Sequence, residues 1–320
     1  MKNVTRSFSK ETIEKMKYFY GDKIDDTPQG AIFRARTDGA VITAYKSGKV
    51  LFQGKGAEEE FTIWSEFAAA DKAEQTTLFR ESSSHVKTDE QTYTNDEVEQ
   101  ILHESHIGSD ESGTGDYFGP VTACAVFVER DCIAVLQEMG VQDSKKVTDR
   151  NILLLTEEIL QMDIPYSSMV IDNEKYNELQ AQGWSQGKMK AILHHSVIQS
   201  VLQKVDESDV QGIVIDQFCP PAVYERHLAS ERHRLHNRTH FMTKAEDHSI
   251  AVATASILAR AKFIQEMDRL SEWIGTELQK GASNKVDEIA AKIMREHGKD
   301  VLNKIAKVHF ANTKKAKALL

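Results

Sequence analysis

Several features are scarce or missing in this chain of 320 residues, and each absence excludes a class of protein. Only three cysteines are present, and they form no CxxC pair, which argues against a disulfide scaffold and a cysteine-ligated zinc site. The longest apolar run, 121–128, has about eight residues, whereas a helix that spans a bilayer needs roughly 20. No charged and then apolar leader opens the sequence, so we expect no signal peptide. These features predict a protein of the reducing cytoplasm that has no contact with a membrane.

Charge is distributed unevenly along the chain. The net charge is -9, yet residues 1–56 carry 11 Lys and Arg against 6 Asp and Glu. A basic segment joined to an acidic body is an asymmetry that suggests a polyanionic partner, such as nucleic acid, at one end. An ordinary solvated surface explains the same basic surplus equally well. The acidic remainder of the chain needs a separate explanation.

Residues 1–71 predict a small α+β domain. Ser9 is a plausible N-cap for a helix over 9–20. Three short β-prone runs follow, AIFRAR, VITAYKS and KVLFQG, separated by turn-forming sequences, and residues 57–70 return to a helical pattern. The polar stretch 72–94 predicts a linker.

Residues 95–320 predict a second, larger domain of the α/β type. Apolar strand candidates alternate with helical stretches. Only a glycine-rich turn separates the first two strands, which implies an antiparallel hairpin and therefore a mixed sheet. The strands are expected at 107–110, 118–128, 164–171 and 212–218, and the helices at about 148–161, 187–205 and 246–270.

Acidic residues lie at the ends of three of these elements. Asp110 and Glu111 close the first strand, and two carboxylates about 4 Å apart repel each other by about 4 kcal/mol at an effective dielectric constant near 20. Asp216 stands in an apolar run, where a charge is costly unless it is paired, hydrogen-bonded or bound to metal. Glu246 and Asp247 open a helix rich in small residues, which is expected to pack closely against a sheet.

If these carboxylates meet at one edge of the sheet, they form an all-oxygen site for hard cations. Such ligands suit Mg²⁺ or Mn²⁺, and carboxylates around two such ions are typical of enzymes that displace a phosphodiester in line. Each acid taken alone also has an ordinary structural explanation. Asp110 and Glu111 could belong to a simple turn, and Asp216 could accept backbone hydrogen bonds at a strand end. Glu246 or Asp247 could be a charge that complements the dipole at a helix N-terminus. Their joint occurrence beside a Gly-x-Gly turn favours the metal site.

Five segments together resemble bacterial ribonuclease HIII, a type 2 ribonuclease H. They are DESGTGDYFGPV (110–121), VQDSKK (141–146), VIDQF (214–218), KAEDHSIAVATASILAR (244–260) and KVHFANT (307–313). QGKGAE (53–58) is similar to the TATA-box-binding-protein-like domain of that family. The resemblance implies a ribonuclease H-like mixed sheet flanked by helices, preceded by a small α+β domain of that kind. It also implies an endonuclease that hydrolyses the RNA strand of RNA–DNA hybrids with two metal ions, leaving 5′-phosphate and 3′-hydroxyl ends.

The resemblance assigns roles to particular residues. The family's catalytic and metal-binding acids map onto Asp110, Glu111, Asp216 and Glu246, with two Mg²⁺ or Mn²⁺ ions per site. Glu246 is chosen over Asp247 because it lies ten residues before Ser256, the serine of ASILAR, and a shared role for Asp247 stays open. The implied substrate contacts are Gly113, Thr114, Gly115, Ser144, Lys145 and Lys146, the glycines through 2′-hydroxyls, with a solvated loop as the alternative for the last three.

Two further groups of residues are interpreted with less specificity. A basic side chain near the C-terminus either adds a phosphate contact or belongs to a basic helix end; these are Lys307, His309, Lys314 and Lys315. The histidines at helix-like spacing are expected to be surface or packing residues rather than ligands; they are His103, His106, His194 and His195.

The expected partner is an RNA–DNA hybrid, which the basic N-terminal domain would hold by its backbone with salt-sensitive, sequence-independent affinity. No obligate protein partner is implied, and we expect a monomer. Ribonuclease HII proteins have Gly-Arg-Gly where this chain has Gly-Thr-Gly, which favours cleavage within runs of ribonucleotides. The alternatives are an HII-like junction ribonuclease that acts at single embedded ribonucleotides, and a hybrid-binding protein without catalysis.

Overall fold

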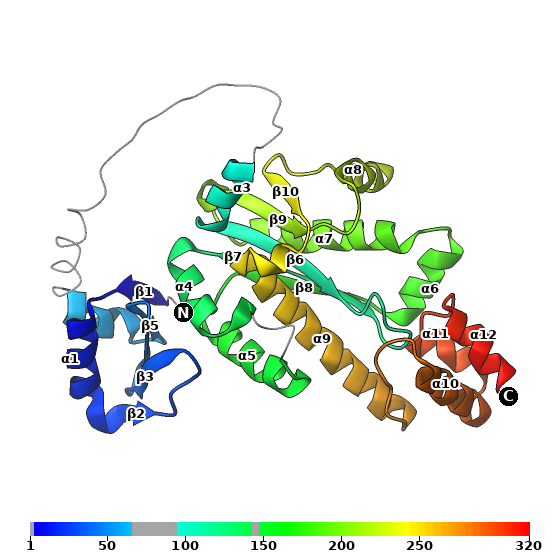
Figure 1. Cartoon of the computed structure of the whole chain (residues 1–320), viewed down its shortest axis with the longest axis horizontal. Helices are drawn as coiled ribbons and strands as arrows, with labels where there is room; N and C mark the ends of the chain where they lie inside the picture. The colour runs from blue at the N-terminus through cyan, green and yellow to red at the C-terminus, as the bar shows by residue number, and fades with distance from the viewer. Residues whose placement is uncertain (1–2, 66–94, 143–146) are drawn as a thin grey trace.

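Two five-stranded sheets organise the computed structural model of the chain (Figure 1), which describes residues 3–65, 95–142 and 147–320. The expected linker at 72–94 and the loop residues Ser144, Lys145 and Lys146 lie outside the described residues. The architecture is mixed α/β with a small N-terminal β domain, which confirms the expected fold class.

The N-terminal sheet is antiparallel and carries helices on one face. Helix α1 (Lys10–Tyr20) begins at Ser9, whose side chain accepts a hydrogen bond from the Thr12 amide and so caps the helix as predicted. A second helical stretch covers 57–65. The sheet has the order β1-β5-β4-β3-β2, with strands Val4–Ser7 (β1), Ile24–Asp25 (β2), Ala31–Arg36 (β3), Val41–Tyr45 (β4) and Lys49–Gln53 (β5). The predicted three-stranded meander is β3-β4-β5, whereas the sequence does not predict β1 and β2.

The larger domain is built on a mixed sheet of order β10-β9-β6-β7-β8. Strand β6 (His106–Ser112) pairs antiparallel with β7 (Val121–Val128) and parallel with β9 (Gly212–Asp216). The sheet continues with antiparallel β8 (Tyr166–Ile171) on one side and parallel β10 (Thr239–Met242) on the other. The hairpin followed by a crossover to a parallel strand confirms the predicted mixed sheet, while β10 is not predicted.

Helices cover both faces of this sheet (Figure 1). On one face α9 (Ile250–Ile274) lies across β6 and β7 and packs with α4 (Arg130–Glu138) and α5 (Asp149–Gln161). On the other face α7 (Gln186–Leu202) contacts β6, β7 and β8, and α8 (Pro221–Ser230) packs on α7. This layering explains why β7 is apolar except for Thr122, because every one of its residues is buried.

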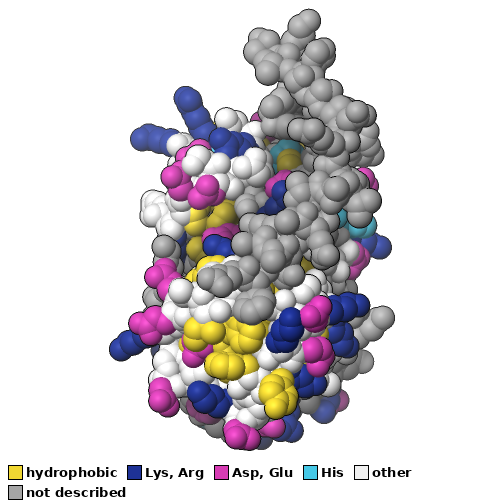
Figure 2. Space-filling model, turned by 90° about the vertical axis from the view of Figure 1, so that its left-hand side faces the viewer, with side chains coloured by type: hydrophobic (Ala, Val, Ile, Leu, Met, Phe, Trp, Pro, Cys, Tyr) yellow, Lys and Arg dark blue, Asp and Glu magenta, His cyan; other side chains and the backbone are white. Residues whose placement is uncertain are grey.

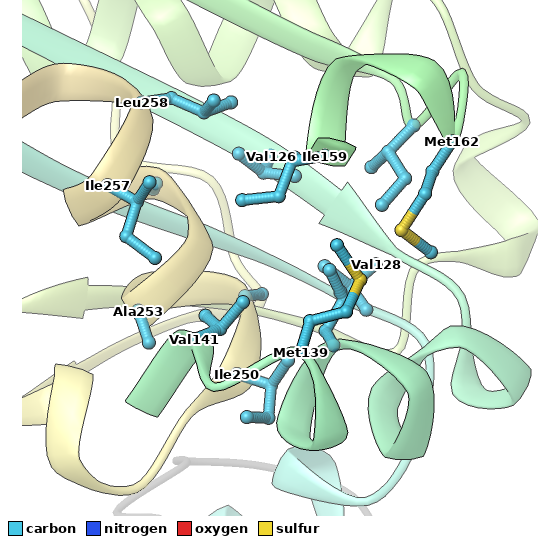
Figure 3. Packing of buried hydrophobic residues seen from close by; sticks show 14 of the residues in the cluster. Val126, Val128, Met139, Val141, Ile159, Met162, Ile250, Ala253, Ile257 and Leu258 are labelled. Carbon is cyan, nitrogen blue, oxygen red and sulfur yellow. The ribbon is translucent and has the colours of Figure 1, made fainter. Parts of the chain in front are cut away.

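The closest packing in the core joins α9 to β6 and β7. Val126 and Val128 of β7 share one hydrophobic cluster with Ile257 and Leu258 of α9 (Figure 3). A Cβ atom on Gly108 of β6 would lie 2.1 Å from the backbone nitrogen of Val252. Only glycine therefore allows the small-residue face of α9 to come this near to the strand that carries the first two acids.

The remaining helices flank this core. Tyr117 and Phe118, which follow the glycine-rich turn, pack into a separate hydrophobic cluster with the C-terminal helices. None of the helices in the described part of the chain combines the length and hydrophobicity that a bilayer crossing requires. The helices whose bounds have not yet been given are α3 (Asn95–Leu102), α6 (Asn173–Ala181), α10 (Asn284–His297), α11 (Leu302–Ile305) and α12 (Ala311–Ala318).

The N-terminal sheet contacts the larger domain through the face that its helices leave open. Tyr45 and Leu51 join the hydrophobic cluster of α4 and α5, and Lys49 pairs with Asp131 at 2.7 Å. Val50 faces the N-terminal helices instead, as the alternation of side chains along a strand requires. Figure 2 shows the outer end of the molecule, where hydrophobic side chains lie among interspersed cationic and acidic ones. The described residues on that face do not form a continuous basic surface.

Candidate active site

The two parallel strands β6 and β9 bring the predicted acids to one place. Ser109 lies opposite Ile215 in the parallel register, so Asp110 and Asp216, the next residues along, lie side by side. Glu246 belongs to the short 3-10 helix η4 (Ala245–Asp247), whose first amide donates a 2.8 Å hydrogen bond to Asp216 Oδ1. The expectation that Glu246 opens the long helix is wrong, because α9 begins at Ile250 behind its own N-cap, Ser249.

Asp110 and Asp216 interact electrostatically with the other two acids. Burial and the nearby charge of Glu111 raise the pKa of Asp110 to about 8, with a further contribution from Asp216, although Ser256 donates a hydrogen bond to Asp110. Burial also raises the pKa of Asp216, and the charge and hydrogen bond of Glu246 raise it further. The four predicted acids therefore form one interacting set of carboxylates at this edge of the sheet.

Glu111 is held by α7, which covers the face of the sheet opposite α9. Lys190 of α7 forms an ion pair with Glu111 Oε1, and His194 Nε2 lies 2.7 Å from Oε2. The second ring nitrogen of His194 lies 2.7 Å from the hydroxyl of Ser109. Burial alone would raise the pKa of Glu111, but the hydrogen bond and charge of His194 and the charge of Lys190 outweigh it and lower that pKa. Neither partner is predicted from the sequence, which assigns no role to Lys190 and a surface or packing role to His194.

The environment of the last acid distinguishes it from its neighbour. Glu246 is half-buried and contacts Asp216, whereas Asp247 is exposed. Lys244, which precedes η4, has a positive φ of 55°, a conformation that costs a residue other than glycine roughly 1–3 kcal/mol. The turn at Lys244 leads directly into η4, where Glu246 hydrogen-bonds Asp216.

The donor set fits a hard divalent cation. In residues 3–65, 95–142 and 147–320, no three His, Cys, Asp or Glu side chains already form a group that could hold a metal ion, and Glu111 is engaged by α7. The chemistry nevertheless suits Mg²⁺ or Mn²⁺, which prefer carboxylate oxygens. Burial and the neighbouring carboxylates, which together raise the pKa of Asp110, both disfavour its charged form, and a bound cation would compensate that charge.

The glycine-rich turn after β6 is buried at Gly113 and exposed at Gly115. Gly113 has a φ of +88°, and a Cβ atom there would lie 2.4 Å from the carbonyl oxygen of Pro120. The carbonyl of Thr114 accepts a 2.9 Å hydrogen bond from Gln186 Nε2 at the start of α7. Gly115 is exposed, and no described atom lies within 4 Å of the position that its Cβ would take. The turn is therefore fixed at Gly113 and Thr114 and accessible at Gly115.

Lys307 does not contact phosphate, and that alternative of the sequence interpretation is wrong. Its side chain is fully buried, and its ammonium donates to the carbonyl oxygens of Asp116 at 2.9 Å, Gly119 at 2.5 Å and Pro120 at 3.2 Å. Burial lowers the pKa of this lysine to about 7, although the charge of Asp116 opposes the shift. Lys307 thus anchors the segment that follows the glycine-rich turn.

Comparison with known proteins agrees with this arrangement. A family model for ribonuclease HII matches residues 107–313, and a model for a domain of unknown function (DUF3378) matches residues 3–77. The chain is 51% identical over 312 residues to ribonuclease HIII of Oceanobacillus iheyensis, across 98% of this chain and 97% of the relative. It is 44% identical over 312 residues to ribonuclease HIII of Bacillus subtilis, across 97% and 96% of the two chains.

Solved structures give the same result. A crystal structure of Bst-RNase HIII in complex with Mn²⁺ matches at a TM-score of 0.68 and 38% identity, covering 99% of both chains. RNase H3 of Aquifex aeolicus matches at a TM-score of 0.53 and 21% identity, which shows a shared fold. By its family models, its full-length relatives and its fold, the chain belongs to the ribonuclease HIII family of type 2 ribonucleases H and is a ribonuclease.

Proposed function

We propose that this enzyme hydrolyses the RNA strand of RNA–DNA hybrids with the help of two divalent metal ions, leaving 5′-phosphate and 3′-hydroxyl ends. The observation that carries the proposal is the convergence of acids from β6, β9 and η4 on one edge of the sheet. The names of the relatives support a ribonuclease H substrate, and the Mn²⁺ complex of Bst-RNase HIII supports a divalent cation. The proposed metal ligands and catalytic residues are Asp110, Glu111, Asp216 and Glu246.

Hydrogen bonds from neighbouring groups orient three of these four acids. When bound, a pair of Mg²⁺ or Mn²⁺ ions supplies activation of the attacking water and stabilisation of the leaving 3′ oxygen. Ser256 orients Asp110 by a hydrogen bond, and the Ala245 amide orients Asp216. His194 holds one oxygen of Glu111 in place. Such hydrogen bonds to ligating carboxylates fix their direction and strengthen metal binding.

We propose that the glycine-rich turn distinguishes RNA from DNA. The exposed backbone at Gly115 can approach a nucleic-acid strand closely, and a 2′-hydroxyl both donates and accepts hydrogen bonds. Gln186 holds the Thr114 carbonyl, so the turn is shaped before substrate arrives. Ser144, Lys145 and Lys146 complete the proposed substrate contacts.

The proposed domain organisation assigns substrate binding to residues 1–71 and catalysis to residues 95–320, with a linker at 72–94. The basic surplus of the N-terminal part supports backbone contacts to the hybrid, which carry no sequence information. The outer end of this module mixes both signs of charge, so the hybrid should use another of its faces. The three cysteines are free thiols, in keeping with the cytoplasm as the proposed location, and we propose a monomer.

Cleavage of a uniform RNA–DNA hybrid, with and without Mg²⁺ or Mn²⁺, tests the reaction. We expect cleavage in the presence of divalent ions and none with a chelator. The matched pair Glu246→Gln and Asp247→Asn tests the site, because the two acids are neighbours, Glu246 is half-buried against Asp216, and Asp247 is exposed. Glu246→Gln should lose cleavage and Asp247→Asn should keep it. The reverse outcome would overturn the assignment.

The two alternative activities predict different cleavage patterns. An HII-like enzyme would cut a duplex with a single embedded ribonucleotide as readily as one with a run of four or more. The Gly-Thr-Gly turn and the HIII relatives favour the run of ribonucleotides. A hybrid-binding protein without catalysis would bind both duplexes and cut neither.

A further inference from the structure

A lysine ammonium lies beside Glu111, one of the four acids of the proposed metal site. Lys190 and Glu111 form an ion pair in which both side chains are 12% exposed. The ammonium also lies 3.9 Å from the centroid of the Phe218 ring, so apolar surface shields the pair from water. A buried carboxylate needs a compensating charge, and Lys190 supplies it for Glu111.

The helical spacing of α7 gives Glu111 two different partners. Lys190 and His194 are four residues apart and project from the same face of the helix, one toward each carboxylate oxygen. His194 is fully buried and is itself held by Ser109. Lys190 is a cation that competes directly with any other cation for the carboxylate, whereas the imidazole N–H can remain hydrogen-bonded to it.

We propose that Lys190 is a built-in counter-cation of the metal site, which neutralises Glu111 until a divalent ion displaces the ammonium. The inference deepens the proposed function and rests on its metal ligands. A group that must leave a ligand before metal binds lowers the apparent affinity for that metal, because its own interaction must be given up. Lys190 therefore stabilises the metal-free fold around Glu111 and lowers the affinity for metal. His194 positions Glu111 both before and after the metal binds.

Calorimetric titration of the full-length protein with Mn²⁺ separates this role from that of an ordinary structural ion pair. Lys190→Met should bind Mn²⁺ at least about threefold more tightly than the wild type, because the metal no longer has to displace an ammonium from Glu111. Lys190→Arg, which keeps the charge, should show no such gain. Lys188→Met is the matched control: Lys188 lies on the same helix, pairs with Glu231 at 2.6 Å, and should leave the affinity unchanged.

Thermal unfolding supplies a second readout. Without divalent ions, Lys190→Met should melt several degrees below the wild type, because Glu111 loses its cationic partner. Saturating Mn²⁺ should reduce this difference in melting temperature. A folded Lys190→Met variant that binds Mn²⁺ as weakly as the wild type, or more weakly, overturns the inference. A difference in melting temperature that saturating Mn²⁺ leaves unchanged overturns it as well. Asp110→Asn in the same titration isolates the underlying assignment. If that variant binds Mn²⁺ like the wild type, the proposed metal site fails and the inference fails with it.

Discussion

Replacing Lys307 by methionine should remove a pH-dependent part of the protein's stability. The buried ammonium of Lys307 has a pKa of about 7 in the folded chain, and burial is the main cause. In the unfolded chain, a lysine stays protonated up to a pH of about 10.4. Three backbone carbonyls solvate the side chain, and the ring of Tyr176 lies 5.7 Å away. Asp116 and His309 are the other charged or titratable groups that interact with it.

The sign and size of the effect follow from proton linkage. Above a pH of about 7, native Lys307 is neutral while the unfolded chain keeps the proton, so the unfolded state binds more protons. The free energy of unfolding therefore rises with pH in this window, by about 1.4 kcal/mol per pH unit. Between pH 7 and pH 9 the contribution of Lys307 grows by roughly 2 kcal/mol, because the native side chain is still half protonated at pH 7. Well below pH 7 both states are protonated, and the contribution is constant.

Urea unfolding between pH 6 and pH 9 measures this contribution. The free energy of unfolding of the wild type minus that of Lys307→Met should increase by roughly 2 kcal/mol from pH 7 to pH 9. Lys304→Met is the control: Lys304 is an exposed cation three residues away, and its difference from the wild type should not change with pH. A wild-type minus Lys307→Met difference that stays flat or falls with pH would refute the reasoning.

Three further changes test other parts of the structure. Asp110→Asn should abolish hybrid cleavage and retain hybrid binding in a gel-shift assay; unchanged cleavage would contradict the assigned role. Gly113→Ala should lower the free energy of unfolding by about 1–3 kcal/mol, because the new methyl would lie 2.4 Å from the Pro120 carbonyl and 2.7 Å from the Phe263 ring; a variant as stable as the wild type in urea would rule out that strain. A chain without residues 1–71 should show a raised KM for the hybrid while kcat survives in part, and an unchanged KM would give the N-terminal module another task.

The features that the sequence predicts correctly are those set by local patterns. The apolar run over Val121–Val128 is a strand buried on both faces, and the short glycine-rich turn before it forms the predicted hairpin with β6. Ser9 caps α1 because its hydroxyl can reach the amide three residues on. The acids at strand ends converge because parallel strands end at the same edge of a sheet. Local pattern and strand direction suffice for these predictions.

What the sequence does not predict depends on contacts between distant segments. Lys307 lies in a basic stretch of the kind usually exposed to solvent. Its ammonium nevertheless donates a hydrogen bond to the carbonyl oxygen of Asp116, 191 residues earlier in the chain. Lys190 and His194 sit on a helix whose pattern carries no sign that Glu111 lies beside it. The start of α9 is displaced from 246 to Ile250 because η4 intervenes, and nothing in the local sequence separates a short 3-10 turn from the first turn of a helix.

The most direct test of the central claim is the position of Mn²⁺ in crystals of the full-length protein, located by anomalous diffraction. Manganese should lie within coordination distance of the carboxylates of Asp110, Glu111, Asp216 and Glu246, and none should be bound there in Asp110→Asn crystals. Manganese bound elsewhere, with these four side chains making no contact to it, would contradict the account.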